Sequence, residues 1–408
     1  MGRRAIPIVA LLFMAVSCTS GAAGETTLPS PEPTASTGIS EAPGGDLDPG
    51  RLAIVDDHGD IVVMAPDGSE RRAVTDRGEN PVLYMQPIWS PDGSTLAWGQ
   101  ATGTGFGIGL GRPDRDEVKT LTTPNLPFYT YWSPDNRHLG ALHNGQSGVQ
   151  FQIVDVDAET TELLDEDAPF YFSWSPTGDR VVTHAGQGRV ETITPDDERV
   201  ELDSTTGNYL APQWTDAGVF HVVDDHLVLE DETGTRTPVA EISGLATFVA
   251  NSRGTLVAVQ STGGDLDGLT ASTEDLPAVR ANAVVVADVA TGDSEQVDDG
   301  LSLGFFWSPD GGSLLVLTTA ESGVVPIVWK AGGDREEFAA YQPDRSMLQD
   351  TFPFFPQYAQ SVSFWAPDSS AFAYAGAVEG QSGIWVQPLG ETTPTRVSDG
   401  SWVAWSPT

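Results

Sequence analysis

The chain has 408 residues, which is enough for one large repeat domain or for two or three ordinary domains. Its 44 glycines and 29 prolines favour many short strands joined by turns over long helices. Its 58 acidic and 20 basic residues give a formal net charge of −38, and such a surface repels phosphates, so nucleic acid is excluded as a partner. The acids are spread along the chain, which is typical of a solvated surface or, alternatively, of adaptation to high salt.

The first 17 residues have the composition of a secretory signal peptide. Basic Arg3 and Arg4 precede an apolar run, residues 5–16, that is too short to span a bilayer as a helix. Cys18 follows small residues and is the only cysteine, so it has no partner for an intramolecular disulfide. The site resembles the bacterial lipoprotein processing site, although Ala15 stands where that family usually has Leu. The resemblance implies that Cys18 is acylated, for example by palmitate, and anchors the chain to the outer face of the cytoplasmic membrane.

Residues 18–49 contain the acylated cysteine and then a stretch rich in Pro, Ser, Thr and Gly. Almost no large apolar side chain occurs there, so the stretch cannot form a core and is predicted to be a flexible tether. The folded domain is expected to occupy residues 50–408.

A repeat dominates the rest of the sequence. An apolar segment leads into Trp-Ser-Pro-Asp-Gly or a variant of it, and a second apolar segment follows. The repeated position recurs every 36 to 58 residues, at Trp89, Trp132, Trp174, Trp214, Ala250, Trp307, Trp365 and Trp405.

The chemistry of this motif predicts a hairpin. Pro presets φ at the second position of a type I turn, and Gly is tolerated at the fourth. Two further strand-like runs follow each hairpin, as in residues 150–157 and 160–166. Four strands in about 40 residues are typical of a propeller blade, in which the Trp packs one blade on the next.

These motifs resemble the repeats of the TolB-like propeller family, and the resemblance covers residues 50–408. It implies an all-β fold, a β-propeller of four-stranded blades. Residues 51–78 supply three strands, and residues 401–408 supply a Trp strand, so the two ends should share one blade and close the ring. This gives eight blades; seven is the alternative, because Ala250 replaces Trp in the fifth unit.

A binding site is expected on the upper face, which we define as the face opposite the Trp-Ser-Pro-Asp-Gly turns. Long insertions at 261–281 and 335–360 map there, and the second, rich in aromatic residues, is predicted to fold over the channel as a lid. Candidate ligand-binding residues are the aromatic side chains at the entries of inner strands and in the second insertion, namely Tyr84, Phe128, Tyr129, Phe170, Tyr171, Tyr209, Tyr341, Phe354 and Phe355. Strand alternation also allows any of the strand residues to belong to the core between blades.

Histidines and acids supply weaker candidates. His143 and His184 end the second strands of neighbouring blades and could face a shared ligand, or else be ordinary turn residues. Asp265 and Asp267 resemble the start of a calcium loop but lack a third alternating ligand, so Ca²⁺ is a weak alternative to having no cofactor.

The sequence favours a binding protein over an enzyme. One Gly-x-Ser-x-Gly match, around Ser302, continues into an inner strand instead of a strand–turn–helix elbow. We therefore expect a monomeric, membrane-anchored binding or scaffold domain for a protein, peptide or glycan of the cell envelope. A propeller-type lyase or hydrolase with its site on the upper face is the alternative, because such enzymes carry no linear motif. A structural or sensory subunit of a membrane complex is a third possibility.

Overall fold

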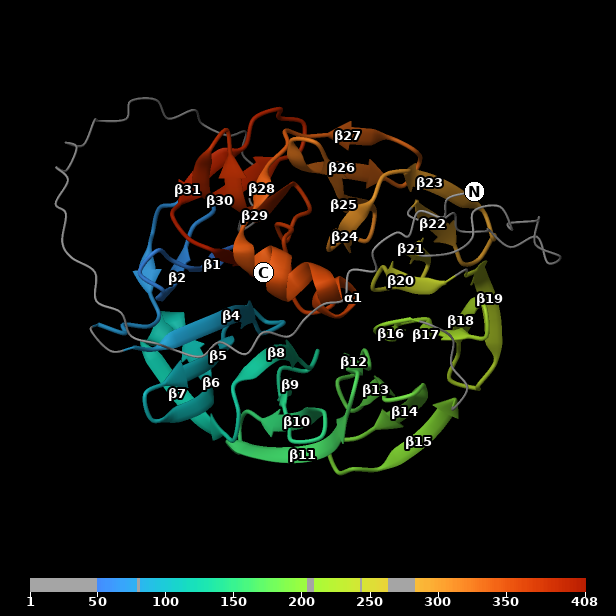
Figure 1. The fold of residues 1–408 in the computed structure, drawn as a ribbon, viewed down its shortest axis with the longest axis horizontal. Helices are drawn as coiled ribbons and strands as arrows, with labels where there is room; N and C mark the ends of the chain where they lie inside the picture. The colour runs from blue at the N-terminus through green and yellow to red at the C-terminus, as the bar shows by residue number, and fades with distance from the viewer. Residues whose placement is uncertain (1–49, 79–80, 204–208, 243, 263–282) are drawn as a thin grey trace, which may run out of the picture. The chain divides into compact units, whose positions relative to one another are not determined.

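Eight four-stranded antiparallel sheets are arranged in a ring, so the fold is an eight-bladed β-propeller (Figure 1). The structure is a computed structural model that describes residues 50–408 except 79–80, 204–208, 243 and 263–282. Among these residues no helix is both long and apolar enough to cross a membrane. The predicted signal peptide, Cys18, the tether, Asp265 and Asp267 lie outside the described residues.

We number the blades in chain order. Blade 1 is β4–β7, and blade 8 is the sheet that combines β1–β3 with β32. Blades 1 to 4 comprise β4 Leu83–Trp89, β5 Leu96–Thr102, β6 Gly105–Arg112 and β7 Glu117–Thr123; β8 Pro127–Trp132, β9 His138–Asn144, β10 Val149–Asp155 and β11 Thr160–Asp167; β12 Phe170–Trp174, β13 Val181–Ala185, β14 Arg189–Ile193 and β15 Arg199–Asp203; and β16 Gln213–Thr215, β17 Gly218–Val223, β18 His226–Glu230 and β19 Arg236–Glu241. Blades 5 to 8 comprise β20 Leu245–Ala250, β21 Leu256–Thr262, β22 Val284–Asp288 and β23 Ser294–Asp298; β24 Ser302–Trp307, β25 Ser313–Ala320, β26 Gly323–Lys330 and β27 Arg335–Glu337; β28 Gln342–Pro343, β29 Ala371–Val378, β30 Gln381–Pro388 and β31 Thr395–Ser398; and β32 Trp402–Trp405, β1 Leu52–Val55, β2 Ile61–Met64 and β3 Arg72–Ala73.

The two ends of the chain share blade 8, as predicted. β1 pairs antiparallel with β32, with Leu52 opposite Trp405 and Val55 opposite Trp402. Blade 5 forms a complete sheet although Ala250 replaces Trp, so the alternative of seven blades is wrong.

The repeated turns are stabilised by local hydrogen bonds. The Ser90 hydroxyl donates to the Asp92 carboxylate over 2.6 Å, and the amide N–H of Ser94 donates to the same oxygen over 3.0 Å. The next residue adopts the left-handed conformation, with φ of +68° at Gly93 in blade 1 and +62° at Asn136 in blade 2. Gly and Asn are the residues that tolerate this conformation best, which explains the end of the motif.

Four of the repeat tryptophans join their blade to the one before it by a hydrogen bond. In four blades the indole Nε1–H donates to the carbonyl of the residue just before the repeat position of the preceding blade. The pairs are Trp89 with Ala404, Trp174 with Tyr131, Trp307 with Val249, and Trp365 with Phe306, at 2.8–3.3 Å.

Blade 5 is joined differently, because Ala250 has no indole. The Gln213 side chain of blade 4 accepts from the Ala250 amide over 2.6 Å and donates to the Ala250 carbonyl over 3.0 Å. A polar side chain of one blade thus replaces part of the joint that a Trp makes elsewhere.

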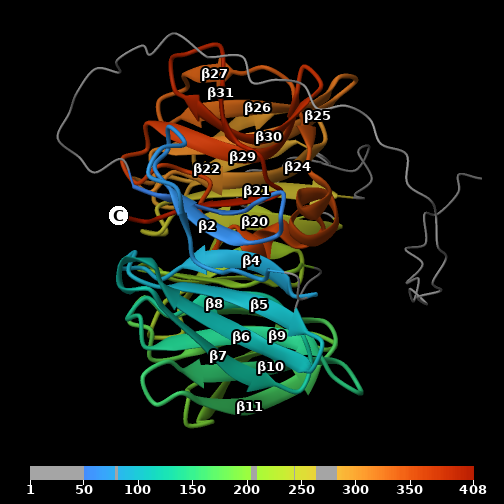
Figure 2. The same ribbon diagram turned by 90° about the vertical axis from the view of Figure 1, so that its left-hand side faces the viewer.

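Helical structure among the described residues is short. It consists of the 3-10 helix η1 Pro113–Arg115, the π-helix η2 Met347–Thr351, the 3-10 helix η3 Phe352–Phe354 and the α-helix α1 Phe355–Tyr358. α1 lies in the middle of the ring in Figure 1, and in the side view of Figure 2 the helical turns and the C-terminus lie toward opposite sides.

Candidate functional site

A segment inserted into blade 7 fills the central channel. The innermost strand of blade 7 is made of two separate pieces of chain. The upper piece is β28, where Gln342 pairs with Ala377 of β29. The lower half is supplied by residues after α1, where the Ala373 amide donates to the Phe364 carbonyl and Trp365 pairs with Phe372. Residues 344–360, which we call the channel segment, leave the sheet between these two halves and enter the channel (Figure 1).

Gln357 fixes the channel segment to blade 3. Its side-chain carbonyl accepts from the Phe172 amide over 2.8 Å, and its amide group donates to the Phe172 carbonyl over 2.6 Å. The primary amide therefore pairs with the free edge of β12 as another strand would. The Tyr129 hydroxyl of blade 2 donates to the Gln357 backbone carbonyl over 2.9 Å. Gln357 is only 2% exposed, so these bonds form away from water.

Aromatic contacts complete the seal. The Tyr358 hydroxyl donates to the Phe128 carbonyl over 3.0 Å and to the Gln86 side chain over 3.1 Å. Phe355 packs edge-on against Phe305 of blade 6, with ring centroids 4.7 Å apart. The insertion predicted to be a lid over the channel is thus a plug within it, because its apolar side chains are buried against the inner strands.

The aromatic residues that the sequence nominated occupy different environments. Tyr84 and Phe128 are half-buried at the upper ends of β4 and β8, and Phe354 of the channel segment is 47% exposed. The other six are buried, namely Tyr129, Phe170, Tyr171, Tyr209, Tyr341 and Phe355. Burial raises the pKa of Tyr171 to about 12 and also raises that of Tyr129, so both hydroxyls stay neutral.

The two nominated histidines are buried and hydrogen-bonded within the protein. His143 Nε2 lies 3.1 Å from the Gln152 side-chain oxygen. The His184 ring stacks on Tyr209 with centroids 4.1 Å apart, and its Nδ1 lies 2.8 Å from the Leu210 carbonyl oxygen. Burial lowers the pKa of both side chains, so they are neutral at pH 7.

A cavity of about 370 Å³ lies on the upper face between blades 8 and 1 and the channel segment. Tyr84, Gln86, Arg77 and Asp350 are among its lining residues. Burial raises the pKa of the Asp350 carboxyl, although the nearby Arg345 guanidinium partly opposes this effect.

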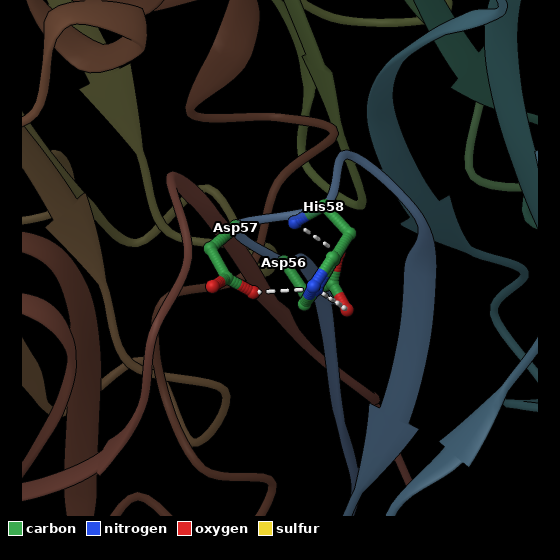
Figure 3. A group of neighbouring side chains, drawn as sticks. All are labelled: Asp56, Asp57 and His58. Carbon is green, nitrogen blue, oxygen red and sulfur yellow. Dashed lines mark hydrogen bonds and ion pairs between the residues drawn. The ribbon is translucent and has the colours of Figure 1, made fainter. Parts of the chain in front are cut away.

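The β1–β2 loop brings three titratable side chains to the rim of this upper cavity (Figure 3). His58 Nδ1 lies 2.9 Å from an Asp57 oxygen and 3.9 Å from an Asp56 oxygen. The three residues are the one group of potential metal ligands found among the described residues, all within 4.8 Å of one another. Asp56 already accepts from Arg71 and from the amides of His58 and Asp60, so its oxygens serve the loop itself.

A second cavity, of about 380 Å³, opens on the lower face, where the repeat turns lie; we call it the lower funnel. Its walls are the tryptophans and prolines of the repeats, and its base is the stretch that follows α1. The lining residues are Trp89, Pro91, Tyr131, Trp132, Pro134, Phe306, Trp307, Pro309, the residues 359–365, Ala404, Trp405 and Pro407.

Among the described residues that line the lower funnel, Tyr131 is the one titratable side chain, and burial raises its pKa, so its hydroxyl stays neutral. None of the described residues that line it is Asp, Glu, His, Lys, Arg or Cys. Pro134, Pro309 and Pro407 are exposed at its mouth, and Trp132 in its wall is buried. The buried Trp132 Nε1–H has no hydrogen-bond partner, unlike the four indoles that bridge blades. β4, the strand that precedes it in the ring, is bulged between Met85 and Ile88, which displaces the ladder there.

The serine of the Gly-x-Ser-x-Gly match has a structural role. Ser302 begins β24, is 5% exposed, and its hydroxyl donates to the Gly304 carbonyl. A nucleophile must be exposed at a sharp turn before a helix, and this residue is not.

Comparison with known proteins identifies the fold alone. Neither the protein-family models nor the curated protein sequences match the chain. An oligogalacturonate lyase in complex with manganese has a TM-score of 0.51 at 13% identity, over 84% of this chain and 98% of that one. A eukaryotic initiation factor has a TM-score of 0.54 at 9% identity, over 88% and 98%. TolB from Acinetobacter baumannii is also similar, with a TM-score of 0.41 at 13% identity, over 71% of this chain and 63% of that one. A lyase and an initiation factor share this architecture, so the similarity shows that the fold is a β-propeller and does not show which activity the chain has.

Proposed function

We propose that this chain is an extracytoplasmic lipoprotein, anchored through Cys18, whose propeller is a binding module that uses the lower funnel. The ligand is a protein or peptide segment of the cell envelope that inserts a side chain between the repeat tryptophans. The signal-like residues 1–17, the lone cysteine and the Pro/Ser/Thr-rich stretch up to residue 49 support the localisation.

The composition of the funnel wall carries this proposal. A hydrolase or lyase needs a positioned acid, base, nucleophile or metal. The described lining of the lower funnel offers aromatic rings, prolines, one amide and three hydroxyls, with no carboxylate or imidazole among these lining residues to activate a serine. Aromatic side chains in a concave site are typical of recognition, because they offer much apolar area and lose little entropy. The volume is at the small end of ligand pockets, about 300–1,000 Å³, which suits one large side chain with its flanking backbone.

The channel segment supports a binding role in a second way. Gln357 and Tyr358 hold it against blades 1, 2 and 3, and the residues that follow, 359–365, form the base of the lower funnel. A ligand on the lower face therefore meets a preformed cavity, and little ordering is needed when it binds.

Blocking the base of the lower funnel tests the proposal. Ser361 lies in the base, where its hydroxyl donates to the Tyr358 carbonyl over 3.4 Å and also interacts with the Tyr129 hydroxyl. A displayed library of random 12-residue peptides is selected against the wild-type protein and then assayed on two variants. We expect the recovered peptides to lose binding to Ser361→Trp, which fills the cavity, and to keep it on Ser361→Ala, which does not.

Equal binding to all three proteins would show that the peptides use another surface and would refute the funnel. Circular dichroism and thermal melting of Ser361→Trp verify that the propeller is intact. If that variant misfolds, Pro134→Trp at the exposed mouth replaces it, because Pro134 lies outside the buried wall.

The upper cavity supports a second candidate, a lyase or hydrolase. There Asp350 has a raised pKa and shares a cavity with Tyr84 and Arg77, an arrangement that can transfer protons. Incubation with oligogalacturonate and Mn²⁺, followed by the ultraviolet absorbance of unsaturated products, tests it. Turnover that disappears in Asp350→Asn would favour the enzyme, and no turnover would leave the binding function as the better account.

A further inference from the structure

We infer that the lower funnel takes a cationic segment, an apolar or aromatic anchor flanked by lysine or arginine. This inference rests on the proposed function of the same site and names the chemistry of its ligand.

Carboxylates follow the prolines at the mouth of the lower funnel. In the repeat turns, the lining residues Pro91 and Pro309 are followed directly by Asp92 and Asp310, whose side chains are exposed. Burial alone would raise the pKa of Asp92, but hydrogen bonds from Ser90 and Ser94 hold it below its ordinary value. Asp310 is held low in the same way by Ser308 and Gly312. These groups stay ionised, so the mouth carries fixed negative charge.

A second ring of acids lies farther from the axis on the same face. Each of the eight loops between third and fourth strands contains at least one Asp or Glu, and only Arg71 and Arg115 are basic in them. The loops are 65–71, 113–116, 156–159, 194–198, 231–235, 289–293, 331–334 and 389–394. Three of the repeat turns also carry an arginine: Arg137 is exposed, Arg180 pairs with Asp179, and Arg253 donates to the Asp310 carbonyl, so acids still outnumber bases on this face. The field at the funnel is therefore negative.

The chain itself shows how this chemistry holds a cation. The Arg51 guanidinium carbon lies 5.0 Å from the centroid of the Trp89 ring, and Trp89 is one wall of the lower funnel. The same guanidinium pairs with Asp114 over 2.7 Å and donates to the Gly93 carbonyl over 3.1 Å. A cation over a tryptophan face with a carboxylate beside it is a favourable arrangement.

Charge excludes the other occupants. Residues 19–49 of this chain contain no Lys or Arg, so the predicted tether does not complement an acidic mouth. A second copy carries the same net charge of −38 and is repelled. Anionic lipid headgroups are repelled for the same reason. A basic segment of another protein remains.

Two synthetic peptides with a neutral fluorophore test the inference, Gly-Lys-Pro-Trp-Pro-Lys-Gly and its counterpart with Glu in place of Lys. Their Kd values are measured by anisotropy on the full-length protein in nonionic detergent. We expect the Lys peptide to bind about tenfold more tightly at 50 mM NaCl, and the preference to fall to about threefold at 300 mM because exposed charges are screened.

A charge series at one position supplies matched variants. Pro309 is exposed at the mouth, and Pro309→Glu and Pro309→Lys lose the same ring constraint while differing by two charges. The Lys peptide should bind about fivefold more tightly to Pro309→Glu than to Pro309→Lys. Asp224→Asn with Asp225→Asn, on the upper face between β17 and β18, is the control and should leave both peptides unchanged.

The outcomes separate the two claims. Equal affinities for the two peptides, or no binding of either up to 1 mM, overturn the cationic ligand, whatever the Ser361→Trp test shows. A preference for the Lys peptide that persists in Ser361→Trp would place the cationic site outside the lower funnel and would overturn the inference, while the funnel itself is judged by the library peptides.

Discussion

The two mouths of the channel are built from the same repeats but end in opposite states. At the upper mouth, an inserted segment occupies the channel and its polar groups pair with the free edges of inner strands, as Gln357 does with Phe172. At the lower mouth, the repeat turns surround a cavity of about 380 Å³ with rings and prolines. A propeller channel offers unpaired strand edges along its length, and the difference teaches that an insertion which pairs with these edges removes them from the surface that a ligand can reach.

Replacing the residue that pairs with β12 should have the largest effect on this contrast. Gln357→Leu leaves the Phe172 amide and carbonyl unpaired in a buried place, so we expect the free energy of unfolding to fall by about 3 kcal/mol. Urea denaturation followed by fluorescence measures it. Gln349→Leu in the same segment, where the side chain is exposed, should change it by less than about 0.5 kcal/mol. A loss below about 1 kcal/mol for Gln357→Leu would mean that the plug is not held by this amide.

The wall of the lower funnel can be probed with one substitution at two places. Trp365→Phe and Trp132→Phe both shrink a buried ring, but only Trp365 gives up a hydrogen bond, to the Phe306 carbonyl at 3.0 Å. We expect Trp365→Phe to be the more destabilising by about 1 kcal/mol. Thermal melting of the two variants side by side gives the difference, and equal losses would show that the indole N–H bridges add nothing measurable.

A smaller effect should appear with pH at a histidine that the sequence nominated for ligand binding. Burial holds the pKa of folded His143 below its ordinary value of 6.5, so the unfolded chain takes up the proton first as the pH falls. The stability associated with neutral His143 is therefore present above pH 6.5 and is lost as the pH drops toward the folded pKa. His143→Gln should flatten the fall in melting temperature between pH 7.5 and pH 5.5, and identical slopes would contradict its burial as a neutral side chain.

The fold was predictable because each level of the sequence agrees with it. Ser-Pro-Asp-Gly defines the turns, β-rich runs flank them, and the strands at the two ends complete a blade. The unit without a tryptophan, at Ala250, also forms a sheet. The interval from Trp214 to Trp307 is long enough for two blades, and the Gln213 side chain bonds to the Ala250 backbone where a Trp bridge is absent.

The site was less predictable, because inner strands do not alternate regularly. Register shifts interrupt β4 between Met85 and Ile88, β8 between Pro127 and Tyr129, and β24 between Ser302 and Gly304. A bulge changes which face the following side chains occupy, so an aromatic residue near it cannot be assigned to channel or core from spacing.

Two signals in the sequence did point to what was missed. Residues 351–360, TFPFFPQYAQ, contain no charged residue in a chain where acids are frequent, which indicates a buried segment instead of a surface lid. Proline recurs two residues after the repeat position at Pro91, Pro134, Pro309 and Pro407, and all four line the lower funnel. The contacts of Gln357 with a strand nearly two hundred residues away have no local signature.

The interruption of the inner strand in blade 7 has a consequence for how the molecule tolerates change. Both ends of residues 344–360 are attached to the same strand, β29, through Gln342 on one side and Phe364 on the other. If the backbone were cut within this segment, both new chain ends would remain hydrogen-bonded to β29. The pairing of β1 with β32 would still close the ring. Lengthening, shortening or cutting this stretch should therefore change the interior of the channel while the ring of blades stays closed.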